Sequence, residues 1–355
     1  NRASISVLHE LRGGPMASIE DIGIDLGSSN VIIAERGKGV IFNEPAVLAV
    51  NHATRNIISM GQEAYQMTGR EPTGITVMRP LQKGTIQDFD LLSLMLNYFV
   101  MRVVGRQLFN RPRALMSISA TSNEIEKRQL ILRMLGAGAR RTQLIERPLA
   151  AALGANISIN EVTGRMVVDI GGATTDIAVI SSGEIMARSI LDTGGDAFTE
   201  ALIRYIRLKH NLLIGWRSAE DLKSAIGTVD VQDQNTLTLP TAGRNLVSGL
   251  PRQADITSQE CAEAAEEPLH ALIEGLHSVI EHIPAELAND VFDEGILLTG
   301  GGAQMRALRE VIEREMQIPV YVAEHPQEAI ALGCAKVLER PGEYARILGD
   351  GRRAR

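Results

Sequence analysis

The stretch VVDIGGATTDIAV, from Val167 to Val179, contains an aspartate, two glycines and two threonines between apolar segments. The apolar segments predict two short buried strands, and the glycines between them predict a tight turn. Glycine lets the backbone approach a ligand closely, and threonine hydroxyls add hydrogen-bond donors. Asp169 and the turn that follows it are therefore candidates for a binding site.

The same pattern occurs near the start of the chain, in IGIDLGSSNVIIAE from Ile22 to Glu35. Both stretches run from an apolar strand through Asp, Gly and small hydroxyl residues to a second apolar strand. A repeated strand-turn-strand unit predicts two similar lobes that face each other. The length of 355 residues also favours two domains, because single cores stop growing near ~250 to 300 residues.

A third glycine-rich turn, TGGGA from Thr299 to Ala303, follows an apolar strand and precedes a helical pattern. Backbone N–H groups at such a helix start favour a phosphate or a ribose edge. If the turns that follow Asp25 and Asp169 face each other, they would bind a polyphosphate between them. Asp25 and Asp169 would then hold Mg²⁺ directly or through its waters. Any one of these turns alone is more often an ordinary hairpin, but three on a repeated scaffold favour a ligand site.

Elsewhere strands and helices alternate, which predicts an α/β fold. Helical periodicity covers residues 88–105, 122–139 and 195–211, and a strand is expected at 113–120. The segment TSQE, from Thr257 to Glu260, is a capping box that predicts the start of a helix toward His282.

The composition indicates a globular protein, with 45% hydrophobic and 22% charged residues. A net charge of −7 argues against nucleic-acid binding through a general basic field. The two cysteines, Cys261 and Cys334, favour a reducing compartment, so a cytoplasmic location is expected. The sequence contains no apolar run of about 18 residues, so no membrane span is expected. The seven histidines show no spacing typical of a metal site.

Residues 1–15 precede Met16 and are interpreted as a leader or an artificial extension. Ile5, Leu8 and Leu11 would share one face of a short helix there, so a weak membrane role is the alternative.

Taken in order, GIDLGSSN, RPLQKGTIQDF, VVDIGGATTDIAV and GILLTGGGA resemble the motifs of the actin, sugar kinase and heat-shock chaperone superfamily of ATP-binding proteins. Five further segments resemble MreB and Mbl-type bacterial actins, which organise cell-wall elongation. These segments are FNEPAVLAV, GQEAYQMTGREP, GAGARRTQLIERPLAAALGA, GLPR and IPVYVAEHPQEAIALG. The resemblance extends from about Ile19 to Leu338.

The resemblance implies an actin-like ATPase fold, in which two similar lobes each have a mixed sheet flanked by helices and a smaller subdomain. The nucleotide cleft would lie between the lobes. The implied boundaries are 16–161 with 327–348 for lobe I, 162–326 for lobe II and 349–355 for a tail, with subdomain IB at about 49–79 and IIB at about 198–261.

The family pattern also implies ATP or ADP with Mg²⁺ as cofactors, and it assigns positions to individual residues. It places Gly27, Ser28, Ser29 and Asn30 on the first phosphate turn, Gly171, Gly172, Ala173 and Thr174 on the second, Gly194, Gly195 and Asp196 by the ribose and phosphates, Glu220 and Lys223 beside the ribose and adenine, and Gly300, Gly301 and Gly302 over the nucleoside. Without the family, Glu220 and Lys223 would be interpreted as a solvated ion pair on one helix face.

One departure from the family concerns catalysis. Arg147, in IERPLAAALG, occupies the position of a family glutamate that helps orient the water attacking the γ-phosphate. A guanidinium cannot act as a base at neutral pH, so we expect slow or altered hydrolysis. Two roles stay open for Arg147, a contact with the γ-phosphate or a salt bridge across the cleft. Thr174 is the other residue expected to act in catalysis.

Milder departures are Ala173 in place of a third glycine, Val31 in place of a hydroxyl residue, and Gln82 with Lys83 in place of a Lys-Asp pair. They leave nucleotide binding as the expectation.

Leu108 and Phe109, in RQLFNRPR, match a loop that dips into the bilayer in MreB-like proteins. Arg106, Arg111 and Arg113 would attract anionic lipid. The alternative is that Leu108 and Phe109 pack under the loop as a small apolar cluster.

The resemblance therefore implies an ATP-binding bacterial actin that forms head-to-tail filaments at the inner face of the cell membrane. Its partners would be further copies of itself, an anionic membrane surface and the membrane proteins of cell-wall elongation, with no nucleic acid. It would determine rod cell shape, and the angle between the lobes would depend on whether ATP or ADP is bound. The alternatives are a regulatory, non-hydrolysing MreB paralogue and a soluble phosphotransferase or chaperone-like ATPase of the same superfamily.

Overall fold

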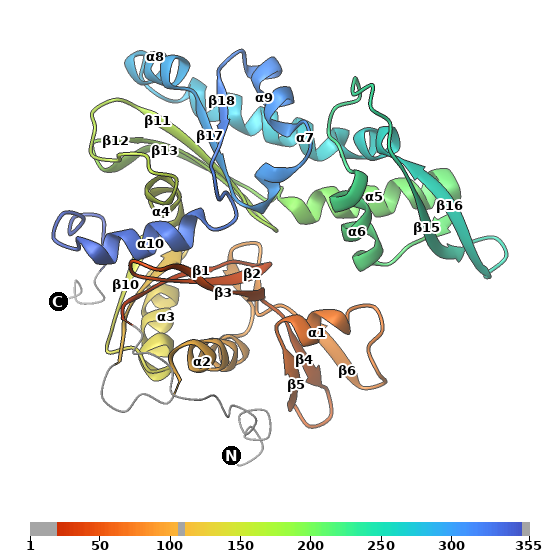
Figure 1. The fold of residues 1–355 in the computed structure, drawn as a ribbon, viewed down its shortest axis with the longest axis horizontal. Coiled ribbons are helices and arrows are strands. Elements are labelled where there is room, and N and C mark those ends of the chain that lie inside the picture. The colour runs from red at the N-terminus through yellow and green to blue at the C-terminus, as the bar shows by residue number, and fades with distance from the viewer. Residues whose placement is uncertain (1–19, 106–110, 350–355) are drawn as a thin grey trace. The chain divides into compact units, whose positions relative to one another are not determined.

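The computed structural model describes residues 20–105 and 111–349, and the chain divides into two compact units. Unit 1 comprises Asn1–Asn160 and Glu328–Arg355, and unit 2 comprises Glu161–Gln327. Figure 1 colours the elements of both units by their position along the chain.

A five-stranded mixed sheet forms the centre of unit 1, in the order β10-β9-β1-β2-β3. Strand β1 pairs with β2 antiparallel and with β9 parallel, and β9 pairs with β10 parallel. The strands are β1 Ile22–Leu26, β2 Asn30–Glu35, β3 Gly39–Pro45, β9 Arg113–Ile118 and β10 Arg141–Glu146. The parallel strands β10, β9 and β1 therefore bring their carboxyl ends to one edge of the sheet.

Helices α2 and α3 of unit 1 begin at side-chain caps. Asp88 accepts the N–H groups of Asp90 and Leu91 before α2, and Asn123 forms a capping box before α3. The apolar face of α2 buries Leu92, Met95 and Phe99 completely in the core. The helices are α2 Phe89–Val104 and α3 Glu124–Gly136, so the predicted helices at 88–105 and 122–139 are confirmed.

Helices α4 (Arg147–Gly154) and α10 (Ala329–Glu339) pack closely together and lie side by side in Figure 1. A Cβ atom on Gly154 would overlap the carbonyl of Ala329, and one on Gly333 would overlap the carbonyl of Ala150. Glycine is therefore required for the two helix backbones to approach this closely. The contact holds α4, whose first residue is Arg147, against the rest of unit 1.

Unit 1 also contains a three-stranded antiparallel sheet in the order β5-β4-β6 and a two-stranded ribbon. These elements are β4 Leu48–Asn51, β5 Ile57–Met60, α1 Gln62–Gln66, β6 Ile75–Met78, β7 Leu81–Gln82 and β8 Thr85–Ile86.

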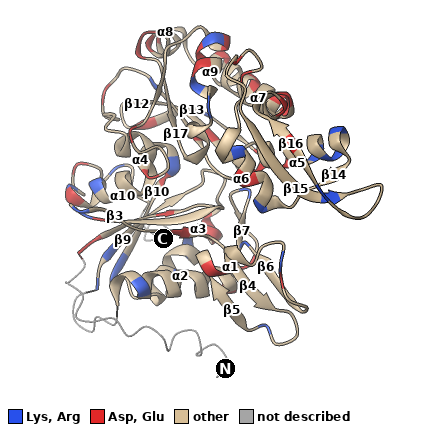
Figure 2. Ribbon diagram, turned by 45° about the vertical axis from the view of Figure 1, so that its right-hand side comes forward, with Lys and Arg blue, Asp and Glu red and all other residues tan. Residues whose placement is uncertain are grey.

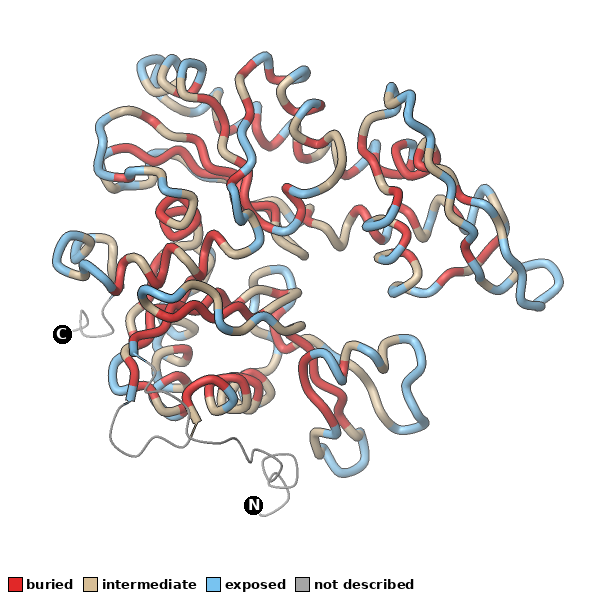
Figure 3. Tube along the Cα trace, in the orientation of Figure 1, coloured by how far each residue is buried: buried red, intermediate tan, exposed pale blue. Residues whose placement is uncertain are grey.

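The main sheet of unit 2 repeats the plan, in the order β13-β12-β11-β17-β18. Strand β11 pairs with β12 antiparallel and with β17 parallel, as β1 does with β2 and β9. The strands are β11 Arg165–Ile170, β12 Thr175–Ser181, β13 Glu184–Leu191, β17 Ile296–Thr299 and β18 Val320–Val322. Every residue of β12 is buried, and Figure 3 shows the central strands mostly in the colour of buried residues. The predicted repeat is confirmed at the level of strand order and direction.

The remaining elements of unit 2 are mainly helices. They are α5 Gly195–His210, α6 Trp216–Ile226, α7 Ser258–Glu281, α8 Ala285–Glu294, the 3-10 turn η2 Gly301–Gln304, α9 Leu308–Met316, and a small sheet of β14 Leu212–Leu213, β15 Thr238–Asn245 and β16 Pro251–Thr257. The capping box of Thr257 and Glu260 at the start of α7 is confirmed.

Figure 2 shows charged residues of both signs on α9. Arg309 and Glu313 pair there at 3.2 Å, one helical turn apart. Such exposed pairs stabilise a helix only slightly. In the part of the chain that the structure describes, no helix combines the length and apolar character needed to cross a bilayer.

Candidate functional site

The two repeated turns close in the same way. In the first turn, Gly27–Asn30, the N–H of Gly27 donates to the carbonyl of Asn30 at 3.0 Å. In the second turn, Gly171–Thr174, the N–H of Gly171 donates to the carbonyl of Thr174 at 2.9 Å. Most residues of both turns are partly exposed, so their backbone amides and hydroxyls are suited to an anionic ligand.

A buried aspartate precedes each turn and accepts a hydrogen bond from a hydroxyl group on the neighbouring parallel strand. Ser117 on β9 donates to Oδ1 of Asp25 at 2.8 Å, and Thr299 on β17 donates to Oδ1 of Asp169 at 3.4 Å. Asp25 and Asp169 keep only 7% and 2% of their surface exposed. Our sequence reasoning missed Ser117, although a hydroxyl residue at the end of an apolar strand was a usable signal.

Arg147 forms an ion pair with Asp25. Nη1 of Arg147 donates to Oδ1 of Asp25 at 2.8 Å, and both residues belong to unit 1. Arg147 is the first residue of α4, and Pro148 is the second. A cation at a helix N-terminus is disfavoured by the helix dipole, and the Asp25 carboxylate offsets that cost.

This pairing tests whether Asp25 suits the predicted magnesium site. Its Oδ1 already accepts two hydrogen bonds, one of them from a guanidinium, which disfavours direct coordination of a metal ion by that oxygen. Asp169 is the carboxylate of the second turn, and Thr299 donates to it. Among residues 20–105 and 111–349, no group of three or more His, Cys, Asp and Glu residues is placed to hold a metal ion by itself.

The second turn is joined to the start of α5. The N–H of Gly195 donates to the carbonyl of Gly171 at 2.9 Å, and the N–H of Asp196 donates to that of Gly172 at 2.7 Å. A Cβ on Gly194 would lie 2.7 Å from both of these carbonyl oxygens. Glycine at 194 therefore allows α5 to begin directly against the turn, and the structure brings these predicted residues together.

Lys223 and Glu220 on α6 join the same part of unit 2. Nζ of Lys223 donates to the carbonyl of Gly195 at 2.9 Å, to Oγ1 of Thr199 at 2.7 Å and to Oε1 of Glu220 at 2.8 Å. The two charged side chains are only 18% and 26% exposed, so this is not a solvated pair. Our sequence reasoning missed Thr199, although it lies four residues after Gly195 on the same helix face.

The triple glycine packs against the end of β11. Gly300 has a φ of +81°, and a Cβ there would overlap the carbonyl of Ile170 and lie 2.7 Å from Oδ1 of Asp169. Gly302 is buried against Ile170, whereas Gly301 is exposed with space around it. The third turn therefore lies beside the aspartate that precedes the second turn.

The first turn has different neighbours. Nδ2 of Asn30 donates to Oδ1 of Asn43 on β3 at 2.6 Å, and the carbonyl of Ser29 accepts the N–H of Ala46 at 2.8 Å. Ser28 is 9% exposed. This turn is therefore tied to the end of β3 rather than to a helix.

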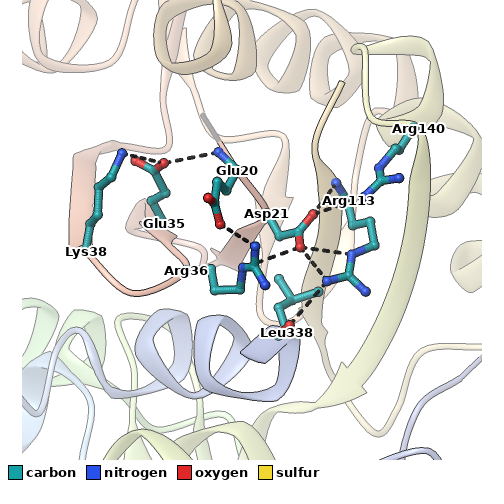
Figure 4. A network of polar contacts seen from close by, with 8 residues as sticks. All are labelled: Glu20, Asp21, Glu35, Arg36, Lys38, Arg113, Arg140 and Leu338. Atoms are coloured by element: carbon teal, nitrogen blue, oxygen red, sulfur yellow. Dashed lines mark hydrogen bonds and ion pairs between the residues drawn. The ribbon is translucent and has the colours of Figure 1, made fainter. Parts of the chain in front are cut away.

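The predicted membrane residues Leu108 and Phe109 lie outside the described residues. Arg113, which we expected near lipid, instead pairs with Asp21. Nε of Arg113 donates to Oδ2 of Asp21 at 2.9 Å, and Nη2 donates to the same oxygen and to the carbonyl of Leu338. Figure 4 shows this network, in which Asp21 lies between Arg36 and Arg113. Arg113 therefore has a structural partner at the opposite end of β1 from Asp25.

This network also changes the pKa of Asp21. Burial alone would raise it, but the hydrogen bonds and charge of Arg113, with the charge of Arg36, hold the pKa of this carboxyl below its usual value.

The fold and sequence match known proteins. The family model of the MreB/Mbl protein matches residues 19–346. The cell shape-determining protein Mbl of Bacillus subtilis is 39% identical over 319 residues, which is 90% of this chain and 96% of that protein. The cell shape-determining protein MreB of Escherichia coli K12 is 40% identical over 324 residues, 90% of this chain and 93% of that protein.

Solved structures agree with this assignment and confirm the predicted actin-like fold. MreB5 of Spiroplasma citri bound to ADP is 31% identical, covers 92% of this chain and 97% of its own, and has a TM-score of 0.85. The MamK double helical filament, at 19% identity and a TM-score of 0.75 over 90% and 98% of the two chains, shares the fold. The chain belongs to the MreB/Mbl family.

Proposed function

We propose that this chain binds ATP or ADP and polymerises into filaments that determine cell shape. Its relatives are named cell shape-determining proteins, and MreB5 of Spiroplasma citri has been solved with ADP and with AMPPNP. The observation that carries the proposal is in unit 2, where the second turn, the start of α5 and Lys223 meet through backbone hydrogen bonds. These hydrogen bonds hold a partly exposed glycine-rich turn in place against the start of a helix, and such a turn suits the phosphates of a nucleotide.

Within unit 2 we assign roles from the family resemblance. The backbone of Gly171, Gly172 and Ala173 and the hydroxyl of Thr174 would bind phosphate oxygens. Gly194, Gly195 and Asp196 would lie by the ribose and phosphates, with Glu220 and Lys223 beside the ribose and adenine. Gly300, Gly301 and Gly302 would cover the nucleoside, and the open space around Gly301 supports this assignment.

Within unit 1 we assign phosphate contacts to Gly27, Ser28, Ser29 and Asn30. We further propose that units 1 and 2 are lobes I and II of the actin-like fold. The sheets β4–β6 and β14–β16 would then belong to subdomains IB and IIB.

The ion pair of Arg147 supports slow hydrolysis. A guanidinium keeps its proton at neutral pH, so Arg147 would not accept one from water. Thr174, partly exposed at the second turn, is the other residue that we assign to the reacting phosphate. If Mg²⁺ accompanies the nucleotide, Asp169 would be its direct ligand, because Oδ1 of Asp25 already accepts hydrogen bonds from Ser117 and Arg147. The same ion pair favours a second candidate function, a regulatory MreB paralogue that binds ATP and joins filaments without hydrolysing it.

We also propose that the filaments lie on the anionic inner face of the cell membrane and meet the membrane proteins of cell-wall elongation. Leu108 and Phe109 would be the membrane contact, supported by the family resemblance of their segment. One subunit would bind weakly, and a filament with many copies would bind through effective concentration.

One experiment tests these proposals together. Purified protein is sedimented alone and with anionic liposomes, in ATP, in ADP or without nucleotide, and phosphate release is measured in the same tubes. We expect ATP-dependent pelleting with little phosphate release, and weaker liposome binding by F109S. Protein that stays in the supernatant under all three nucleotide conditions would contradict the filament proposal. ATP turnover that requires a small acceptor molecule would indicate a phosphotransferase.

A matched pair of glycine variants tests the nucleotide site itself. G194A places a Cβ against the carbonyls of the second turn, whereas G342A places one in open space. We expect G194A to lose nucleotide affinity and G342A to keep it, as measured by calorimetric titration. Equal nucleotide affinities of G194A and G342A would show that the second turn is not part of the nucleotide site.

A further inference from the structure

Three neighbouring parallel strands of unit 1 bring one polar residue each to the same point. Asp25 lies near the end of β1, Ser117 near the end of β9, and Arg147 directly follows β10. Ser117 Oγ and Arg147 Nη1 each donate to Oδ1 of Asp25 at 2.8 Å. The sequence predicts a metal ligand at Asp25, but the structure shows a carboxylate that already has a cation as its partner.

The pair is well sheltered from water, since the side chains of Arg147 and Asp25 are 14% and 10% exposed. A divalent cation bound to Oδ1 would have to displace these donors and would lie close to the guanidinium. Like charges repel strongly at such separations where water is largely excluded. The guanidinium stays protonated across the physiological pH range, so a change of pH does not relieve the repulsion.

The position of Arg147 is set by the fold rather than by a flexible side chain alone. Arg147 begins α4, and α4 packs against α10 at the glycine contact of Gly154 and Gly333. Pro148, as the second residue of α4, restricts the backbone at the same place. The guanidinium is therefore fixed beside the carboxylate that precedes the first turn.

We infer that Arg147 is a permanent cation at the first turn, where it takes the part of a metal ion, and that this chain holds ATP with little dependence on Mg²⁺. The inference rests on the proposed function, because it requires the first turn to contact the phosphates. Asp25 and Arg147 together carry no net charge, so the first turn does not repel a polyphosphate. A glutamate at 147 would leave two adjacent carboxylates, which repel phosphate and bind divalent cations.

The test is calorimetric titration of the full chain with ATP, in MgCl₂ and in excess EDTA, with no measurement of turnover. For the unchanged protein we expect the two dissociation constants to differ by less than about threefold. R147E should bind ATP about tenfold or more weakly in EDTA than in MgCl₂. R128E makes the same charge change on an exposed residue of α3 in the same unit, and it should behave like the unchanged protein.

Two further variants keep the test decisive if R147E does not fold. R147Q removes the charge without adding a carboxylate and should show a smaller Mg²⁺ dependence of the same sign. D25N should change the ATP affinity by the same factor in MgCl₂ and in EDTA, because Asp25 is not a metal ligand, whereas a tenfold loss confined to MgCl₂ would overturn the inference. A loss of about tenfold or more by the unchanged protein in EDTA would also overturn it. No ATP binding in either buffer would contradict the proposed function, and this inference with it.

Discussion

The first and second turns share a scaffold but differ in their neighbours. Both have the same strand order, the same closing hydrogen bond and a buried aspartate that accepts a hydroxyl from the next parallel strand. The first aspartate pairs with Arg147 from α4, whereas the second turn is joined by its backbone to α5. The repeat thus determines the geometry of each turn, and residues from outside the repeat determine its charge.

The largest effect on stability is expected at Gly300, because the corresponding position in the first half of the repeat is not a glycine. Gly300 follows Thr299 as Ile118 follows Ser117. G300A places a Cβ against the carbonyl of Ile170 at a φ of +81°. We expect a loss of about 3 kcal/mol or more in the free energy of unfolding, measured by urea denaturation.

The control for this prediction is G342A, where an added Cβ has open space and the unfolding free energy should change little. Equal stabilities of G300A and G342A would show that the third turn does not depend on its close contact with β11.

The ion pair at the first turn should show a measurable coupling energy between Asp25 and Arg147. D25N removes the carboxylate charge beside the mostly buried Arg147, and we expect a loss of about 2 kcal/mol in the free energy of unfolding. The double variant D25N/R147Q should recover part of that loss, because removing both charges leaves neither unpaired. Additive losses in this double-mutant cycle, followed by urea denaturation, would mean that the pair contributes no coupling energy.

Lys223 ties α6 to the start of α5 at the second turn. K223M removes three hydrogen bonds, to Gly195, Thr199 and Glu220. We expect ATP affinity to fall by about tenfold, or about 1.4 kcal/mol, in calorimetric titration. K127M, which breaks a pair on the exposed face of α3, serves as the control, and equal affinities of the two variants would exclude Lys223 from the site.

The smallest effect concerns the opposite end of β1, at Asp21. Its folded pKa is lowered relative to the ordinary carboxyl value of 3.8, so the unfolded chain takes up this proton first as pH falls. The stabilisation is therefore fully present above about pH 5 and is lost as pH falls through the folded pKa. R113Q should reduce stability at pH 7 by about 1 kcal/mol and flatten this acid dependence. Unchanged acid profiles in thermal melts would contradict the role of Arg113.

The strands and turns that carry the site were predictable, because their pattern is local. Alternation of apolar segments with Asp, Gly and hydroxyl residues predicted β1, β2, β11 and β12, and the capping box predicted α7. Ser117 and Thr199 were missed, because each acquires its role from a partner distant in the sequence. Ser117 lies 92 residues from Asp25, and Lys223 lies 24 residues from Thr199.

The sequence by itself determined the repeat, the family and the positions of the glycine-rich turns, since these depend on residue types at short spacing. Only the tertiary structure decided that Arg147 neutralises Asp25. That contact joins β1 to the start of α4 across 122 residues, and it forms because parallel strands gather their carboxyl ends at one sheet edge. Residue spacing along the chain carries no information about which charge arrives there.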